Sequence, residues 1–169
     1  MIEQEVLRIS VNELTQLSGR IQDCLGRLTA DQIWLRQTEN ENAIGNLVLH
    51  LCGNMNQWIG TGVAGRPDTR QRDKEFAARG SISPRELSEK LAATISDVTN
   101  IITNVPHARL LEKTTIQNYN VTLVEVIIHV VEHFAQHTGQ IIFATKLLTG
   151  QDLGYYKHLN QPKHKETTP

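Results

Sequence analysis

Three histidines follow one another at steps of four in the segment HVVEHFAQH: His129, His133 and His137. The chain has only seven histidines, so this segment holds nearly half of its imidazoles. In an α-helix, residues four apart have Cβ atoms about 6 Å apart, and their imidazoles can converge on one metal ion. Residues eight apart are separated by about 12 Å along the axis, too far for both to bind the same ion. The spacing therefore predicts that at most one adjacent pair binds a metal.

A helical wheel favours His133 and His137 as that pair. With His137 at zero, Val130 and Ile141 lie within about 40° of it, which places His137 in the middle of the apolar, inward-facing stripe. His133 lies about 40° away and also faces inward, whereas His129 lies at about 80°, where polar residues begin. We therefore predict that His129 lies at the rim, where it either supports the site, shuttles protons or faces solvent.

A third ligand must come from another helix, and His50 in NLVLHLCGNMNQW is the candidate. It lies at the border of an apolar stripe, with Asn46, Asn54 and Gln57 on the same side, and this pattern indicates the wall of a wet pocket. Three histidines leave a coordination position open, which is typical of catalytic rather than structural zinc. Asn54 and Gln140, one turn beyond His137, are candidate pocket groups. The alternative is that the inward histidines are simply satisfied by hydrogen bonds.

Helical periodicity covers nearly the whole chain, and no alternating apolar and polar run flanked by hairpin turns interrupts it. The sequence SPRE gives the clearest helix start, with Ser83 as the N-cap, Pro84 at the first position and Glu86 completing a capping box. Gly150 is a natural end for the last helix. The sequence predicts an all-α protein, a four-helix bundle, with long helices over residues 2–28, 42–60, 84–103 and 122–149.

The connection GRPDTRQRDKEFAARGSI, residues 65–82, is dense in charge and shows little periodicity. Loops of this length in a small domain are often functional. Arg70, Arg72 and Glu75 are candidates for closing over the site and recognising an anionic group of a substrate. The alternative is a solvated connection whose charges pair with one another.

Length and composition narrow the class of protein. A chain of 169 residues predicts one domain, residues 1–160, followed by a disordered polar tail, residues 161–169. The net charge of −1 gives no attraction to nucleic acid or to anionic membranes, and no apolar run approaches a membrane span. The first residues do not resemble a signal peptide. Cys24 and Cys52 are expected to be reduced, buried thiols in a cytoplasmic protein.

The last predicted helix carries a second apolar strip on its other side. A helix that is apolar on two sides is either central or covered by another surface. We predict a homodimer that buries part of this strip; the alternative is cover by residues 104–121 or by the C-terminal segment of the same chain. The strip consists of Val124, Ile128, Val131, Ala135 and Ile142.

Several segments resemble the DinB-like superfamily of metalloenzymes, also called damage-inducible or YfiT-like: NLVLHLCGNMNQWI, RPDTRQRDKEF, HFAQHTGQI and TGQDLGYY. The resemblance covers nearly the whole chain and points to a subgroup without an assigned function. It implies an up-down-down-up four-helix bundle that holds a divalent metal ion, often zinc or nickel. The ligands that it implies are His50, His133 and His137, and it gives His129 no ligand role.

The leading hypothesis for function is a metal-dependent enzyme. The resemblance implies either a transferase that uses a low-molecular-weight thiol as co-substrate or a hydrolase. Two alternatives stay open: a non-catalytic metal-binding module of a stress response, and a purely structural or interaction bundle. The first would bind metal without turnover, and the second would bind no metal.

Overall fold

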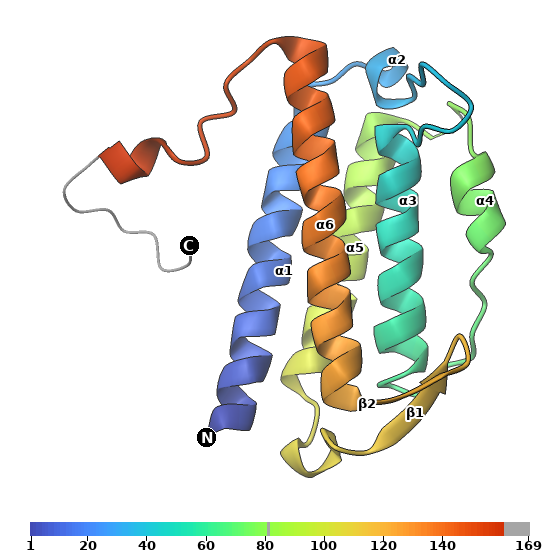
Figure 1. The fold of residues 1–169 in the computed structure, drawn as a ribbon, viewed down its shortest axis with the longest axis vertical. Coiled ribbons are helices and arrows are strands. Elements are labelled where there is room, and N and C mark those ends of the chain that lie inside the picture. Colours follow the sequence, from blue (N-terminus) through green and yellow to red (C-terminus); the bar gives the residue numbers. More distant parts are fainter. Residues whose placement is uncertain (81, 161–169) are drawn as a thin grey trace.

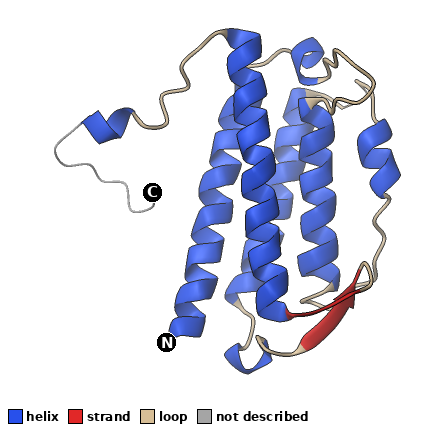
Figure 2. Cartoon of the chain, viewed as in Figure 1, coloured by secondary structure: helices blue, strands red, loops and turns tan. Residues whose placement is uncertain are grey.

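A computed structural model describes residues 1–80 and 82–160 of the chain, so the tail predicted at 161–169 lies outside the described residues. The described chain is mostly helical, with one small antiparallel sheet (Figures 1 and 2). Its elements, in chain order, are α1 (Ile2–Gly26), α2 (Ala30–Ile33), α3 (Ile44–Met55), the π-helix η1 (Asn56–Thr61), α4 (Arg72–Ala77), α5 (Pro84–Thr103), the 3₁₀ turn η2 (His107–Arg109), β1 (Lys113–Ile116), β2 (Tyr119–Thr122), α6 (Leu123–Thr149) and the 3₁₀ turn η3 (Lys157–Asn160).

The four long helices α1, α3, α5 and α6 lie side by side (Figure 1). α1 and α6 run in one direction, and α3 and α5 run in the opposite direction. α1 packs against α5 and α6, and α3 packs against the same two helices. None of the helices in the described ranges combines the length and apolar character that a membrane crossing requires.

The helix starts follow the capping signals in the sequence. The Ser83 hydroxyl accepts a hydrogen bond from the Glu86 backbone N–H at 3.2 Å, and the Glu86 carboxylate accepts one from the Ser83 N–H at 2.8 Å, so α5 begins in a complete capping box. Thr122 and Glu125 start α6 in the same way. The predicted helix over 42–60 instead divides into α3 and the π-helix η1, and α1 ends two residues earlier than predicted.

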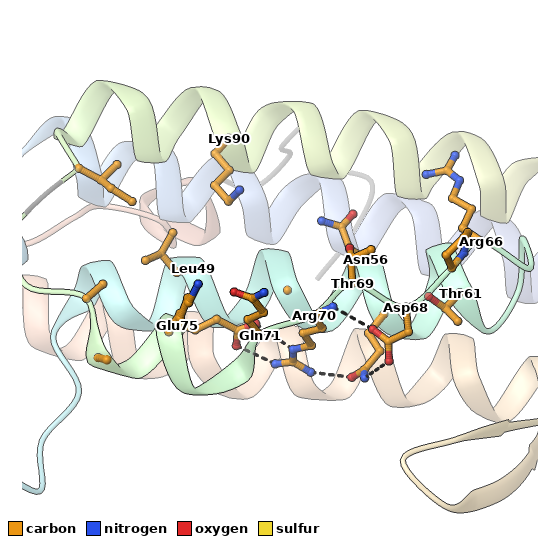
Figure 3. A pocket seen from close by; sticks show the side chains of 17 residues that line it. Leu49, Asn56, Thr61, Arg66, Asp68, Thr69, Arg70, Gln71, Glu75 and Lys90 are labelled. Atoms are coloured by element: carbon orange, nitrogen blue, oxygen red, sulfur yellow. Dashed lines mark hydrogen bonds and ion pairs between the residues drawn. The ribbon is translucent and has the colours of Figure 1, made fainter.

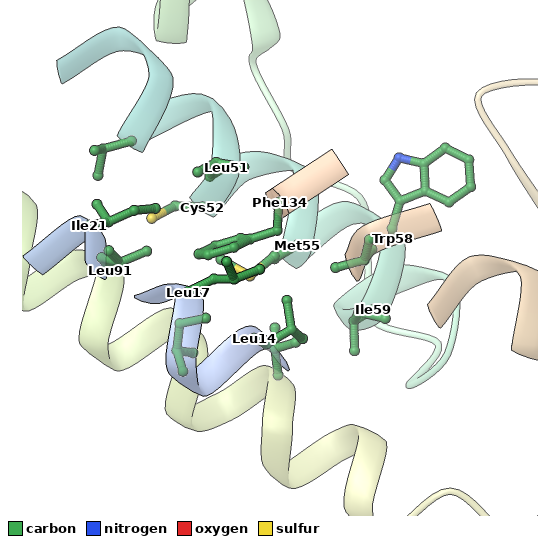
Figure 4. Close-up of a cluster of buried hydrophobic side chains, with 14 of the residues drawn as sticks. Leu14, Leu17, Ile21, Leu51, Cys52, Met55, Trp58, Ile59, Leu91 and Phe134 are labelled. Carbon is green, nitrogen blue, oxygen red and sulfur yellow. The ribbon is translucent and has the colours of Figure 1, made fainter. Parts of the chain in front are cut away.

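The core lies between the four long helices (Figure 4). Phe134 of α6 is fully buried at its centre. Apolar side chains at three- and four-residue spacing on each long helix point toward this centre, as an amphipathic bundle requires. Substitution of a buried Phe by Ala typically costs about 3–5 kcal/mol, so this side chain fixes α6, and with it the histidines of α6, against the other helices. Labelled neighbours in the cluster are Leu14, Leu17, Ile21, Leu51, Met55 and Leu91.

A short hairpin, β1–β2, corrects the expectation of a chain without strands. Its two tight-turn residues, Gln117 and Asn118, have φ values of 50° and 66°, the left-handed conformation that two-residue hairpin turns use. Ile116 is buried, and a Cβ on Gly62 would lie 2.1 Å from its Cδ1 atom, so the hairpin packs closely onto the end of η1. Four-residue strands are too short to produce a clear alternating pattern.

Residues 66–78, which we call the strap, run along α3 and include the short helix α4. The buried Asn46 side chain of α3 anchors this segment: its Nδ2 donates to the backbone oxygens of Glu75 at 2.9 Å and Ala78 at 3.1 Å. The alternative of a solvated connection therefore holds for most of the strap, whose residues are largely exposed, but not for Glu75, which is buried. The prediction that Asn46 lines a wet pocket was wrong, because that amide serves as an attachment point.

Candidate metal centre

The three predicted ligands converge between α3 and α6. His50 projects from α3, and His133 and His137 project from successive turns of α6. The Nε2 atom of His133 lies 3.1 Å from Nε2 of His50 and 3.2 Å from Nε2 of His137. All three ligand atoms lie within 4.8 Å of one another. His50 is buried, and the two α6 histidines are partly buried, so the group is open on one side.

Two of the three imidazoles are oriented through their other nitrogen. The Nδ1 atom of His50 lies 3.0 Å from a carboxylate oxygen of Glu75, and Nδ1 of His137 lies 2.6 Å from the side-chain oxygen of Gln140. An oxygen acceptor at Nδ1 favours a proton there, which leaves the Nε2 lone pair free. At His50 the Nη2 atom of Arg70, a donor, lies at the same 3.0 Å from Nδ1, so the carboxylate and the guanidinium compete for this nitrogen. The buried Nδ1 atom of His133 has no hydrogen-bond partner in the described residues.

Glu75 is itself held by Arg70. The guanidinium donates to both carboxylate oxygens, each at 2.8 Å, in a bidentate pair. It also donates to the side-chain oxygen of Gln57 at 2.9 Å. The side chains of His50, Glu75 and Arg70 are only 7%, 10% and 5% exposed. This arrangement is a buried carboxylate that links a guanidinium to an imidazole.

The protonation of the group follows from this packing. Burial lowers the pKa of His133 to about 3, with further contributions from the neighbouring His137 and His50. Burial also lowers the pKa of His137, although its hydrogen bond to Gln140 opposes the change. Burial would raise the pKa of Glu75, but the hydrogen bonds from Arg70 and His50 outweigh it and hold that pKa below its ordinary value. The site therefore combines a carboxylate anion, Glu75, with two imidazoles, His133 and His137, that favour the neutral, metal-binding form.

The residues fit a divalent ion. Bonds of about 2 Å from a tetrahedral ion to imidazole nitrogens place those nitrogens roughly 3.3 Å apart, close to the two measured Nε2 separations. Nε2 of His133 lies at this distance from the Nε2 atoms of both His50 and His137, and the single proton of a neutral His133 can satisfy at most one of these contacts. A cation at their centre satisfies all three lone pairs at once. The three-histidine group can therefore hold a metal ion.

Gly53, one turn after His50 on α3, makes room for the carboxylate. A Cβ atom at this position would lie 1.9 Å from the Oε1 atom of Glu75. No larger residue fits without moving Glu75 from the imidazole. The glycine in NLVLHLCGN thus has a specific steric role that helix propensity alone does not reveal.

The other predicted site residues lie around the group with different roles. His129 is partly buried, with its ring centroid 4.0 Å from that of Trp58 and 5.7 Å from that of His133. Asn54 is buried, and its side-chain oxygen has no partner among the described residues. Gln140 is exposed, and its side-chain oxygen lies 2.6 Å from Nδ1 of His137.

The prediction for the charged loop needs correction. The side chains of Arg70 and Glu75 are not exposed for contact with a substrate above the histidines, because both are buried in the cluster with His50. Arg72 is exposed, and its guanidinium lies 4.9 Å from the centroid of the Phe76 ring. That ring in turn lies 4.7 Å from the ring of His50. Sequence reasoning missed Phe76 entirely, and the motif RDKEF carried no periodicity that would have found it.

The predicted orientation of α6 about its axis also needs a small correction. His137 was placed at the middle of the inward stripe of α6, but that stripe is centred on Phe134, with Val130, Thr138 and Ile141 beside it. His133 and His137 lie on the flank of this stripe that faces α3. This position keeps both imidazoles out of the apolar core and accessible from one side.

The fold and the site define a class: mostly helical proteins with a three-histidine group between two long helices. The chain belongs to the DUF1572 family, whose members are proteins of unknown function, and the family model matches residues 2–165. No curated protein matches the chain. Among solved structures, the chain is similar to a conserved protein from Enterococcus faecalis, with a TM-score of 0.71 and 16% identity over 85% of this chain and 97% of that chain. At this identity the likeness shows the fold alone.

Proposed function

We propose that this protein is a metal-dependent enzyme in which His50, His133 and His137 hold one divalent ion through their Nε2 atoms. The observation that carries the proposal is the convergence of the three ligand atoms within 4.8 Å. The Nδ1 partners of His50 and His137 support it, since metal-binding histidines characteristically donate their other N–H to an oxygen acceptor. Three protein ligands with one open side are typical of catalytic sites.

A divalent ion here would supply a nucleophile at neutral pH, either by lowering the pKa of a bound water or by holding a small-molecule thiolate. Glu75 keeps the proton of His50 on Nδ1 and adds negative charge behind it. Arg72 is exposed and lies over the ring of Phe76, which in turn contacts the ring of His50, and it takes the role of recognising an anionic substrate group. We propose zinc or nickel as the ion, because imidazole nitrogens suit both metals.

Elemental analysis of protein purified without added metal tests the proposal. The native chain should contain about one ion per chain, and His133→Ala and His137→Ala should contain far less, since each variant loses one of three ligands. His107→Ala is the matched control, because His107 is exposed and outside the group. Full occupancy in both ligand variants, with all proteins folded, would refute the site.

A substrate screen then separates the two reaction types. If the nucleophile is a small thiol, an electrophile is consumed only when that thiol is added, and the product carries the sulfur. If the nucleophile is water, esters or amides are hydrolysed without thiol. Metal without turnover in either arm would favour the non-catalytic metal-binding module.

We also propose that the directions of the four long helices are those of the up-down-down-up four-helix bundle, and that the family is related to the DinB-like superfamily. The helix directions in Figure 1 and the order of the three histidines along the chain support both. Residues 1–160 would then form one domain. The free, buried Cys24 and Cys52 fit a reducing, cytoplasmic compartment.

The homodimer remains a proposal, now confined to part of the apolar strip. Ala135 and Ile142 line a groove together with Leu153 and Tyr155 of the C-terminal segment, so the same chain flanks that end, where Ile142 is partly buried and Ala135 is exposed. Ile128 stays 41% exposed. We expect Ile128→Glu to convert a dimer to a monomer in light scattering. A monomeric native chain at micromolar concentration would contradict the proposal.

A further inference from the structure

A second cavity lies behind the strap, away from the imidazoles. It is open to solvent, has a volume of about 770 Å³ and is lined by residues of α3, η1, α5 and the strap. None of the three histidines lines it, whereas Arg70 and Glu75 form part of its wall. Pockets of about 300–1,000 Å³ are the size that small-molecule ligands occupy. The cavity is therefore separate from the metal centre but shares one wall with it.

The charge of the cavity is unbalanced. Four cationic side chains and only two carboxylates line it, in a chain whose net charge is −1. Both carboxylates are already engaged: Glu75 by Arg70 and His50, and Asp68 by the side chain of Gln57 at 2.7 Å and the backbone N–H of Arg70 at 3.0 Å. The donors on Asp68 are neutral and leave its charge in place, so four cations against two carboxylates give the lining an excess of two positive charges.

Two of the four cations form no ion pair within residues 1–80 and 82–160. Arg70 pairs with Glu75, and Arg66 pairs with Asp97 of α5. In the described part of the chain no carboxylate pairs with Lys74 or Lys90. Figure 3 shows Lys90 reaching from α5 toward α3 and the strap, across the cavity from Arg70. Two unpaired ammonium groups at the edge of one cavity attract a negatively charged group.

The rest of the lining is suited to an organic molecule rather than to a bare ion. Leu49 lies near Lys90 at one end, and Ala78 and Ile82 add further apolar surface to the lining. Asn56 and Thr69 present hydrogen-bonding groups at the other. A few polar and charged groups on an otherwise apolar wall are characteristic of small-molecule sites.

We propose that this cavity binds a small organic anion, with its negative group between Lys74 and Lys90 and its apolar part against Leu49 and Ile82. The ligand has the chemistry of a phosphate ester or carboxylate that carries a short apolar group. The site is distinct from the metal centre, and the proposal does not depend on the activity proposed for that centre.

Phenyl phosphate is the probe, followed by NMR shifts of the ¹⁵N-labelled full chain. We expect saturable binding with a Kd below about 1 mM and with the largest shifts in the strap and in residues 49–57. Benzyl alcohol, which is neutral, and inorganic phosphate, which lacks the ring, should each bind at least about tenfold more weakly. Equal binding of benzyl alcohol, or no saturation by phenyl phosphate, would overturn the proposal.

Matched variants locate the binding. Lys90→Gln should weaken binding by about fivefold or more through loss of a charge-assisted contact, whereas Lys113→Gln, an exposed lysine on β1, should change it less than about twofold. Ala77→Trp fills the cavity without a change of charge and should abolish saturation.

His137→Ala should bind phenyl phosphate as the native chain does. Loss of binding in His137→Ala would instead assign the probe to the metal centre, and equal losses in both lysine variants would show non-specific attraction.

Discussion

The substitution Glu75→Gln separates a positioning role of Glu75 from a purely structural one. Gln has almost the same size and can still accept one hydrogen bond from His50, but it carries no charge. Loss of the oxygen partner of a metal-binding histidine typically weakens metal affinity by about 10–100-fold, which corresponds to roughly 1.4–2.7 kcal/mol. We expect the affinity for zinc, measured at pH 7.5 by competition with a chromophoric chelator, to fall within this range.

The same substitution should also destabilise the metal-free protein. Glu75 is the carboxylate that balances Arg70, and both side chains are at least nine-tenths buried. A buried charge left without its partner costs about 3 kcal/mol or more, because it is neither hydrated nor paired. For a chain of this length such a loss lowers the melting temperature by roughly 10 °C. Thermal unfolding in the presence of a chelator measures the stability of the metal-free protein, without any contribution from metal binding.

The double variant Arg70→Gln/Glu75→Gln distinguishes the two effects. It removes both charges, so much of the lost stability should return. The affinity for zinc should stay low, because no carboxylate then faces His50. If the double variant regained native affinity, Glu75 would matter only for folding. If Glu75→Gln folded and bound zinc within twofold of the native chain, the role assigned to Glu75 would be wrong.

Three further changes test the packing around the site. Gly53→Ala should weaken zinc binding about as much as Glu75→Gln, because its Cβ would lie 1.9 Å from the carboxylate; Gly19→Ala, with nothing within 4 Å, should instead stabilise the chain by about 0.5–1 kcal/mol. Burial raises the pKa of Cys52 to about 11, so iodoacetamide at pH 8 should alkylate this thiol only in denaturant; rapid alkylation of the native chain would show that the thiol is accessible. Ser83→Ala removes the cap of α5 and should lower the free energy of unfolding by about 1 kcal/mol in urea titrations; no measurable change would mean that the capping box contributes nothing.

The convergence of the three histidines could be predicted from the sequence because it depends on local geometry. The four-residue step fixes the distance between His133 and His137, and the apolar stripes of their two helices bring His50 to the same interface. Helix starts at Ser83 and Thr122 were equally predictable, since a capping box is complete within four residues.

The role of Glu75 could not be predicted in this way. It lies 25 residues from His50, in a segment without periodicity, and its place is set by contacts that α3 makes along its whole length. Asn46 fixes the backbone of Glu75, Gly53 leaves space for its carboxylate, and Gln57 binds its partner Arg70. These three residues follow one another at steps of seven and four along α3 and the π-helix η1 that continues it. Two members of the polar stripe that the sequence presented as a pocket wall, Asn46 and Gln57, therefore bind the strap.

Through Glu75 and Arg70, the strap contributes to both proposed sites, the metal centre and the anion-binding cavity. The carboxylate of Glu75 faces His50 on one side, while Glu75 and Arg70 form a wall of the cavity that also contains Lys74 and Lys90. Arg70 touches the carboxylate, the imidazole and Gln57 at once, so it cannot move toward a ligand in the cavity without changing the charge behind His50. Any effect of an anion on metal affinity must then be matched by an equal effect of the metal on anion affinity, because the coupling between two binding sites is reciprocal.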